Sequence, residues 1–237
     1  MNKKILAILL CTSQVWGAIA IDVQKAGGEA DAASGLTWSH TMGAGANNAL
    51  VVCVDVYYTS GGAPTATYAG QSLTQETGGK LAGGDNYYTY IFYGYGLPTG
   101  ANNVVLSGAA NSYWLANSTS FTGAFQGSPD NITAFVTAAG LSQSISITPV
   151  AANAFAIDCA GTQTSTVLTQ GAWGNMTETK GTAAFSIASS YTGPVSTAQT
   201  NTYTASFSVQ WGDSAITIAP ASTLSILTIK GGQLVIK

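Results

Sequence analysis

The sequence predicts an all-β protein: a single β-sandwich, jelly-roll-like or Ig-like, that follows a cleaved signal peptide. Apolar and polar residues alternate with a period of two along most of the chain, and no sustained 3.6-residue period follows the first residues. Roughly a dozen such runs stand about 8–12 residues apart, separated by turn clusters rich in Gly, Pro, Asn and Asp. This spacing is typical of sandwiches and jelly rolls.

Residues 1–20 are predicted to be an export signal. Lys3 and Lys4 give a positive start, residues 5–10 form an apolar run, and Ala18-Ile19-Ala20 is a small-residue cleavage site. The apolar run is shorter than the roughly 20 residues that span a bilayer. The mature chain is therefore expected to be secreted, outside the cell or on its surface, without a membrane span.

The mature chain is expected to begin with a strand and a flexible tether at residues 21–35, followed by one sandwich domain at residues 36–237. Residues 21–25 alternate like a strand, and residues 26–35 are rich in Gly and Ala. No linker or change of composition divides the rest. The strands predicted within it are residues 49–58, 87–95, 103–106, 113–121, 132–136, 144–148, 154–159, 183–188, 202–211, 215–218 and 223–230.

Composition excludes several classes of partner. The chain contains no arginine, and without Lys3 and Lys4 it has five lysines against ten acidic residues. No cationic track is available to neutralise phosphates, so nucleic acid is not an expected partner. Polarity comes instead from Ser, Thr, Asn and Gln. Such a surface repels its own copies weakly, which suits self-association.

Four segments carry a resemblance to a known group of modules. They are Leu36-Thr37-Trp38-Ser39-His40-Thr41, Ala49-Leu50-Val51-Val52, Tyr68-Ala69-Gly70-Gln71-Ser72-Leu73-Thr74, and the stretch from Tyr113 to Phe121-Thr122-Gly123. In this order they resemble a loosely defined group of β-sandwich modules from secreted bacterial and phage-associated proteins. The resemblance implies a sandwich fold and carries no catalytic signature.

Cys53 and Cys159 are the cysteines of the mature chain, and an even number in an exported protein suggests one disulfide. Alternation argues against it. The apolar face of residues 49–58 is that of Leu50 and Val52, which places Cys53 on the opposite face, whereas Cys159 shares the apolar face of its own strand. A disulfide and two buried thiols both remain open.

No catalytic, cofactor or metal site is predicted. His40 is the single histidine and is expected to be structural, and the G-x-S-x-G motif of serine hydrolases is absent. Asp55 and Asp158 are the acidic residues that fall within predicted strands. We expect both side chains to face solvent. Three alternatives are that they form a buried pair, a calcium site, or the acid and base of a hydrolase.

Aromatic residues are the strongest candidate binding feature. The run from Tyr87 to Tyr95 places rings on both faces of one strand, and an exposed row of Tyr87, Tyr93 and Tyr95 could stack on sugar rings. Burial of both faces is the alternative. Candidate N-glycosylation sequons occur at Asn117, Asn131 and Asn175.

Together these features predict a secreted, non-catalytic structural protein that assembles with itself into an extracellular fibre or surface array through β-strand contacts. Both chain ends could supply the strand: Ile21 and Val23 at the start, Leu234 and Ile236 at the end. The alternative function is a monomeric carbohydrate-binding or adhesive module that uses exposed Tyr and Trp.

Overall fold

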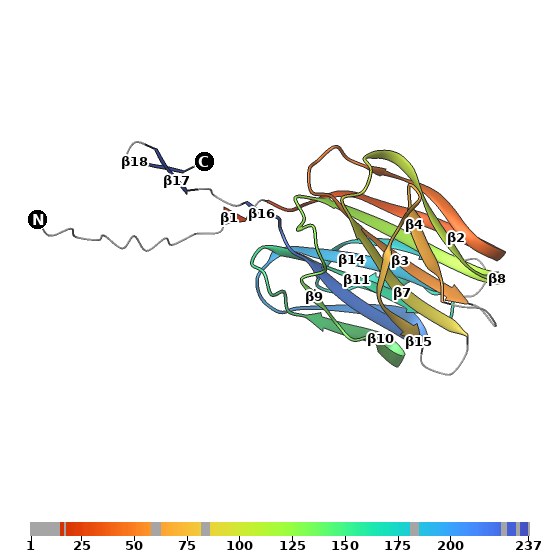
Figure 1. Ribbon diagram of the computed structural model, residues 1–237. Coiled ribbons are helices and arrows are strands. Elements are labelled where there is room, and N and C mark those ends of the chain that lie inside the picture. Colours follow the sequence, from red (N-terminus) through yellow and green to blue (C-terminus); the bar gives the residue numbers. More distant parts are fainter. Residues whose placement is uncertain are drawn as a thin grey trace, which may run out of the picture.

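The computed structural model describes residues 15–16, 18–57, 63–81, 86–180, 185–223, 227–230 and 233–236. Every regular element in these residues is a β-strand, which confirms the all-β prediction. Two seven-stranded antiparallel sheets form the body, and two small strand pairs lie beyond one end of it (Figure 1). The described residues include no helix long and apolar enough to cross a bilayer.

The first sheet has the strand order β5-β4-β8-β3-β7-β6, and β2 also pairs with β8. One end of β8 pairs with β4 and the other end with β3, while β2 follows β8 along its whole length. The sheet curls around an apolar core of its own, supplied by β2, β3, β4, β7 and β8. Its strands are β2 (Ala20–Met42), β3 (Ala49–Tyr57), β4 (Thr65–Tyr68), β5 (Gln71–Ser72), β6 (Thr74–Lys80), β7 (Tyr87–Tyr95) and β8 (Gly100–Thr122).

The second sheet has the order β10-β15-β11-β14-β13, and β9 and β12 also pair with β15. Two smaller buried clusters pack on its outer face. Its strands are β9 (Asn131–Ile132), β10 (Val136–Ile147), β11 (Ala154–Thr162), β12 (Leu168–Gln170), β13 (Gly174–Lys180), β14 (Ser186–Val195) and β15 (Gln199–Ile218).

The two sheets repeat the same topology. β2, β3, β4, β6, β7 and β8 pair with one another in the pattern of β10, β11, β12, β13, β14 and β15. We call residues 20–122 the first repeat and residues 136–218 the second repeat. Even a backbone detail recurs: Asn47 before β3 has φ 54° and Asn153 before β11 has φ 60°, a left-handed conformation that Asn tolerates better than most residues.

The register of the β2–β8 pair and that of the β10–β15 pair are interrupted by a bulge at the same place. In the first repeat the β2–β8 pairing jumps from Ala33↔Ser112 to Gly35↔Ser107, and in the second the β10–β15 pairing jumps from Gly140↔Val209 to Ser142↔Thr204. A buried tryptophan side chain forms a hydrogen bond to each bulge. The indole N–H of Trp114 donates to the Ala33 carbonyl over 3.2 Å, and that of Trp211 donates to the Gly140 carbonyl over 3.0 Å.

A local two-fold axis relates the repeats, and a disulfide lies on it. Cys53 and Cys159 occupy equivalent positions on β3 and β11, and they bond to each other with a Cα–Cα distance of 5.5 Å, within the ordinary range. Cys53 Sγ lies 3.8 Å from the carbonyl oxygen of Ala188, and Cys159 Sγ lies 3.5 Å from that of Tyr90, the equivalent residue. The repeats therefore pack like the subunits of a symmetric dimer.

The faces assigned from alternation are correct, but the argument against the disulfide that was drawn from them is wrong. β3 is buried on both faces: Leu50 and Val52 face the core of the first repeat, whereas Val51 and Cys53 face the second sheet. Cys53 and Cys159 thus enter one core shared by both repeats. The argument failed because β3 lies between two cores, so the face opposite to Leu50 is also apolar.

The prediction of a flexible tether after the first strand is also wrong. Residues 26–35 continue β2 and pair with β8 through several bulges, and Ile21 pairs with Phe121 of its own sheet. Bulges accommodate the Gly and Ala residues that suggested flexibility. Most strands predicted elsewhere are present but often joined: residues 103–106 and 113–121 both belong to β8, and residues 202–211 and 215–218 both belong to β15. The strand predicted at residues 132–136 is wrong, because residues 133–135 form no strand and separate β9 from β10. Of the strands predicted at residues 183–188 and 223–230, residues 183–184 and 224–226 lie outside the described residues.

The ends form two small strand pairs. β1 (Val15–Trp16) pairs with β16 (Ser222–Thr223), and β17 (Leu227–Lys230) pairs with β18 (Gln233–Ile236). Most of the predicted signal peptide lies outside the described residues. We call β17 and β18 the C-terminal strand pair; Figure 1 places it away from both sheets, near β1 and β16.

The disulfide generates a stability prediction. The double variant Cys53→Ala/Cys159→Ala should lower the free energy of unfolding by roughly 3 to 5 kcal/mol, because the bond closes a loop of 106 residues in the unfolded chain. Urea unfolding followed by tryptophan fluorescence measures this. Reduced wild-type protein is the control and should match the variant; equal stability of oxidised protein and variant would contradict the bond.

Candidate functional site

A groove opens in the first repeat where its curled sheet fails to close. It has a volume of about 470 Å³ and lies between β4 and β6, two strands of this sheet that do not pair with each other. The amide of Leu73 donates to the carbonyl of Ala66 over 2.8 Å and closes one end. We call it the β4–β6 groove; its lining residues are Ala63, Pro64, Thr65, Ala66, Thr67, Ser72, Leu73, Gln75 and Phe92.

The lining combines an apolar floor with neutral polar walls. Leu73 and Phe92 are buried, while the hydroxyl of Ser72 and the amide of Gln75 belong to exposed side chains. None of the lining residues that the structure describes is ionisable. This described lining can bury apolar groups and form hydrogen bonds.

The second repeat has a larger side chain at the position of Leu73. Leu73 lies directly before β6, and at the same place before β13 stands Trp173, which is 1% exposed. The ring of Trp173 lies in the core of the second repeat, where it packs with Ile145 and Ile147 of β10.

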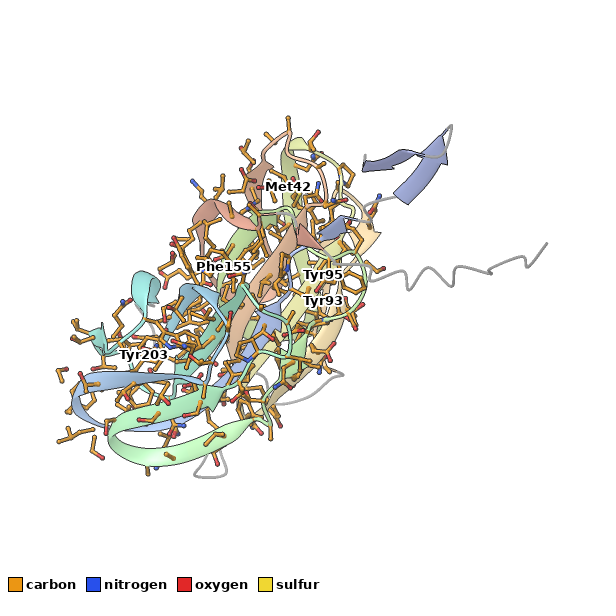
Figure 2. The ribbon with its side chains drawn as sticks, turned by 90° about the vertical axis from the view of Figure 1, so that its left-hand side faces the viewer. Met42, Tyr93, Tyr95, Phe155 and Tyr203 are labelled. Atoms are coloured by element: carbon orange, nitrogen blue, oxygen red, sulfur yellow. A yellow bond between two sulfur atoms is a disulfide. The ribbon has the colours of Figure 1, made fainter. Side chains whose placement is uncertain are left out.

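A buried polar cluster is the second unusual feature, and it belongs to the second repeat. Asp158 Oδ1 accepts hydrogen bonds from the Ser190 amide (2.8 Å), the Ser190 hydroxyl (3.0 Å) and the Tyr203 hydroxyl (2.7 Å), and its Oδ2 accepts one from Asn201 (2.8 Å). Asp213 lies diagonally across on β15, opposite Ala160, and neither of its buried carboxyl oxygens accepts a hydrogen bond of ordinary geometry from the residues that the structure describes. We call Asp158, Ser190, Asn201, Tyr203 and Asp213 the acidic cluster; Tyr203 marks it in Figure 2.

Burial controls protonation in this cluster. It raises the pKa of Asp158 to about 6 against the hydrogen bonds that favour the carboxylate. It raises the pKa of Asp213 well above its ordinary value, and the neighbouring charge of Asp158 adds to the effect. Asp213 is therefore the carboxyl that holds a proton most firmly.

The first repeat has an apolar core at the positions of the acidic cluster. The matching ladders place Val52 where Asp158 lies and Leu106 where Tyr203 lies. Phe92, Val104 and Ala116 stand at the positions of Ser190, Asn201 and Asp213, and all three are buried. The fold therefore does not require the cluster, but all five polar side chains are buried, so it cannot contact a substrate without opening the core.

The expectation that Asp55 and Asp158 face solvent is wrong, because both are fully buried. They also do not form a pair. Asp55 lies between the sheets, where Thr89 donates to its Oδ1 (3.2 Å) and Gly161 leaves it room: a Cβ on Gly161 would stand 2.7 Å from its Oδ2. Burial raises the pKa of Asp55 well above its ordinary value. Asp158 points to the opposite face of β11, so the two carboxyl groups lie in different cores.

His40 is buried and hydrogen-bonded. Its Nδ1 lies 2.8 Å from the hydroxyl of Ser118, which also accepts the indole N–H of Trp38 over 3.1 Å. Burial lowers the pKa of His40 to about 4, so the ring is neutral at physiological pH.

The tyrosines proposed as glycan platforms are partly buried instead of forming an exposed row. Tyr87, Tyr93 and Tyr95 pack against the core shared by the two sheets. The rings of Tyr93 and Tyr95 lie 5.4 Å apart in an edge-to-face arrangement, and Figure 2 shows them side by side. The ring of Tyr87 packs edge-on against Phe185 of the second sheet. Each of the three residues is intermediate in exposure.

The sequons differ in their surroundings. Asn117 is 1% exposed, donates to the Thr177 carbonyl and accepts the Ser189 hydroxyl, so a glycan at this residue is incompatible with the fold. Asn131 is half-buried and donates to the Thr148 carbonyl. Asn175 lies on β13.

Exposed apolar side chains gather at the bulge of the second repeat. Leu141 is 59% exposed and Phe207 44%, on the two strands that face each other there. Val167 is 53% exposed and precedes β12, which pairs with the same part of β15. The first repeat carries Ser34, Ala110 and Ala63 at these positions. We call Leu141, Val167 and Phe207 the bulge patch.

Sequence reasoning missed the groove and Asp213. Asp213 follows Gly212 between two predicted strands, and this suggested a turn, whereas β15 runs through both.

Comparison with protein families, with curated proteins and with solved structures gave no match to the chain. The resemblance to secreted bacterial and phage-associated sandwich modules therefore stays a prediction.

The acidic cluster generates a prediction about pH. A group with a raised pKa in the folded state keeps its proton where the unfolded chain has lost it, so the free energy of unfolding falls as pH rises through that range. For Asp158 the range runs from 3.8 to about 6, and for Asp213 it starts at 3.8 and extends well above. The lowered pKa of His40 acts in the opposite direction between about 4 and 6.5.

Asp213→Asn removes one of these carboxyls and leaves His40 unchanged. Urea unfolding between pH 4 and 8 should show a shallower decline with pH for this variant, by up to about 1.4 kcal/mol per pH unit for one proton. Asp31→Asn, at an exposed residue, removes the same charge and should leave the wild-type slope. Parallel curves for wild type and Asp213→Asn would contradict the assignment.

Proposed function

We propose that this protein is a secreted, non-catalytic structural module, a doubled β-sandwich of jelly-roll-like or Ig-like type, that assembles with copies of itself outside the cell. The observation that carries the proposal is the C-terminal strand pair. In the described part of the chain, β17 and β18 pair with each other and with no strand of either sheet.

The strand pair is amphipathic by register. Leu227 lies opposite Ile236 and Ile229 opposite Leu234, so these four residues belong to one face. The other face has Thr228, Lys230, Gln233 and Val235. An isolated two-stranded ribbon is marginally stable in water and needs an apolar surface to cover it. A neighbouring copy can supply that surface.

The opposite end of the chain is less suited to this role. Ile21 and Val23 belong to β2, where Ile21 packs against the shared core and the amide of Val23 lies 3.2 Å from the Ser120 hydroxyl. A strand that already pairs with its own sheet would have to leave it before joining another. Of the two terminal segments considered, Leu234 and Ile236 therefore remain the better candidates for contact between subunits.

Other features support a structural role outside the cell. A buried disulfide suits an oxidising compartment. The carboxyls that could act as acid and base are buried in separate cores, which weighs against hydrolysis. Glycan binding by tyrosines is weakened because the rings of Tyr87, Tyr93 and Tyr95 are packed edge-on or tilted.

Sedimentation velocity of the mature protein tests the proposal. Wild-type protein should form assemblies larger than a monomer, and Leu234→Asp/Ile236→Asp should sediment as a folded monomer, because charge on the apolar face opposes its burial. Circular dichroism confirms that the variant is folded.

Thr228→Asp/Gln233→Asp is the matched control, since it adds the same charge to the polar face of the same strand pair. This variant should still assemble. A wild-type protein that stays monomeric at all concentrations tested would refute the proposed function.

A further inference from the structure

We propose that the outer edge of β10 pairs with the same edge of a second copy of this chain, antiparallel and about a two-fold axis. This inference rests on the proposed function, which is self-assembly, and adds a contact that is independent of the C-terminal strand pair. It is carried by residues 142–147, which we call the β10 edge. The structure describes this stretch together with all its side chains.

The strand β10 lies at the end of the strand order of the second sheet, and β15 is the strand among the described residues that pairs with it. In an antiparallel pair, alternate residues direct their backbone groups away from the neighbour, so an outer edge offers unpaired amides and carbonyls. Two carbonyls of β10 accept side-chain donors: Trp211 donates to Gly140 and Gln143 donates to Ser144. The outward amides of the β10 edge have no acceptor in the described part of the chain.

The side chains of the β10 edge are compatible with pairing to itself. One face exposes Ser142, Ser144 and Ser146, and the other buries Gln143, Ile145 and Ile147. Residues that stand opposite each other in an antiparallel pair share a face, so serine must meet serine. A two-fold axis at Ser144 places this residue opposite its own copy, and Ser142 opposite the Ser146 of the second copy. A charge in this stretch would meet a like charge, and β10 contains none.

The distribution of charge sets this region apart from the first repeat. The charged residues that the structure describes as exposed are Lys25, Glu29 and Asp31, and all three lie on β2. The exposed residues of β10, and those of β15 between 199 and 209, are Val, Leu, Phe, Ala, Ser and Thr. Charged side chains are a common means by which proteins keep edge strands from pairing with other molecules. The β10 edge lacks this protection.

The bulge patch adds apolar contact to the same surface. It begins at Leu141, directly before the β10 edge, and a two-fold pairing places the patch of each copy beside the far end of the partner's strand. Exposed apolar groups that adjoin one another mark interaction sites. The equivalent stretch of β2, residues 36–42, is also an edge without Lys, Asp or Glu, but Ser34, Ala110 and Ala63 replace the patch there. This difference assigns the contact to β10.

The size of the contact determines its place in the assembly. Two short strand edges bury little surface, and on their own they do not offset the loss of translational and rotational freedom. Molecules already joined through the C-terminal strand pair have a high effective concentration, and the second contact then forms readily. A two-fold contact closes on itself. The β10 edge therefore joins single filaments side by side in pairs, and a variant without the C-terminal contact remains monomeric.

Charge at the edge is the first test. Ser144→Lys/Ser146→Lys places like charges opposite each other at two exposed positions, so the variant should still form filaments, but with about half the wild-type mass per length, because paired filaments separate. Scanning transmission electron microscopy measures mass per length, and circular dichroism confirms the fold. Thr37→Lys/Ser39→Lys is the matched control, since it adds the same charges at the equivalent exposed positions of β2 and should keep the wild-type value.

Cross-linking is the second test and does not depend on a loss of assembly. Under mild oxidation, assembled Ser144→Cys should form a disulfide-linked dimer, because residues opposite each other have Cα atoms roughly 4.5–5.5 Å apart, which a disulfide spans. Thr200→Cys is the control: it is exposed on the same face of β15, and its copy would lie at least about 14 Å away, three strand spacings. This control should give no dimer. The native disulfide is buried and does not exchange under these conditions.

The outcomes separate the two proposals. A monomeric wild type refutes the proposed function and the β10 contact with it. Filaments whose mass per length is unchanged in Ser144→Lys/Ser146→Lys, with no dimer of Ser144→Cys, leave the proposed function standing and overturn the β10 contact. A mass per length that falls in Thr37→Lys/Ser39→Lys instead would also overturn it, since the contact would then belong to β2.

Discussion

The shared core between the two repeats is the constraint on which the rest of the structure depends. Each sheet has one face against its own cluster and one face against the other repeat, so β3 and β11 are buried on both sides. Neither repeat could expose this inner face to water without loss of its main apolar contact. The bond between Cys53 and Cys159 fixes the arrangement at its local axis.

With the interface fixed, the outer parts of the repeats have diverged in opposite directions. The first repeat keeps an apolar core around Val52 and Leu106 but leaves a groove above Leu73. The second repeat has Trp173 at the position of Leu73 and holds Asp158 and Tyr203 in its interior. Burying polar groups in a core that has an apolar counterpart lowers stability; hydrogen bonds offset this cost for Asp158, whereas Asp213 accepts none from the described residues. The comparison identifies features that the fold itself does not explain.

Sequence predicted the fold class because alternation reports directly on strands, and the 49–58 and 87–95 predictions agree closely with β3 and β7. It could not predict the repeat. Corresponding strands are separated by different numbers of residues, and few identities survive beyond Cys53/Cys159 and Trp114/Trp211. It also could not place Asp55 or Asp158, because a strand buried on both faces has no polar side from which to infer exposure. The groove depends on a missing closure between β4 and β6, which only the pairing pattern reveals.

The position of the disulfide has a mechanical consequence. A pulling force that enters through the first repeat and leaves through the end of the second must cross the interface between them, and there a covalent bond links β3 to β11. Both are interior strands, each hydrogen-bonded to a neighbour on either side. The repeats cannot separate under load until one of these strands is sheared out of its sheet. Resistance to extension is therefore set by backbone hydrogen bonds acting in parallel and not by the apolar contact between the repeats.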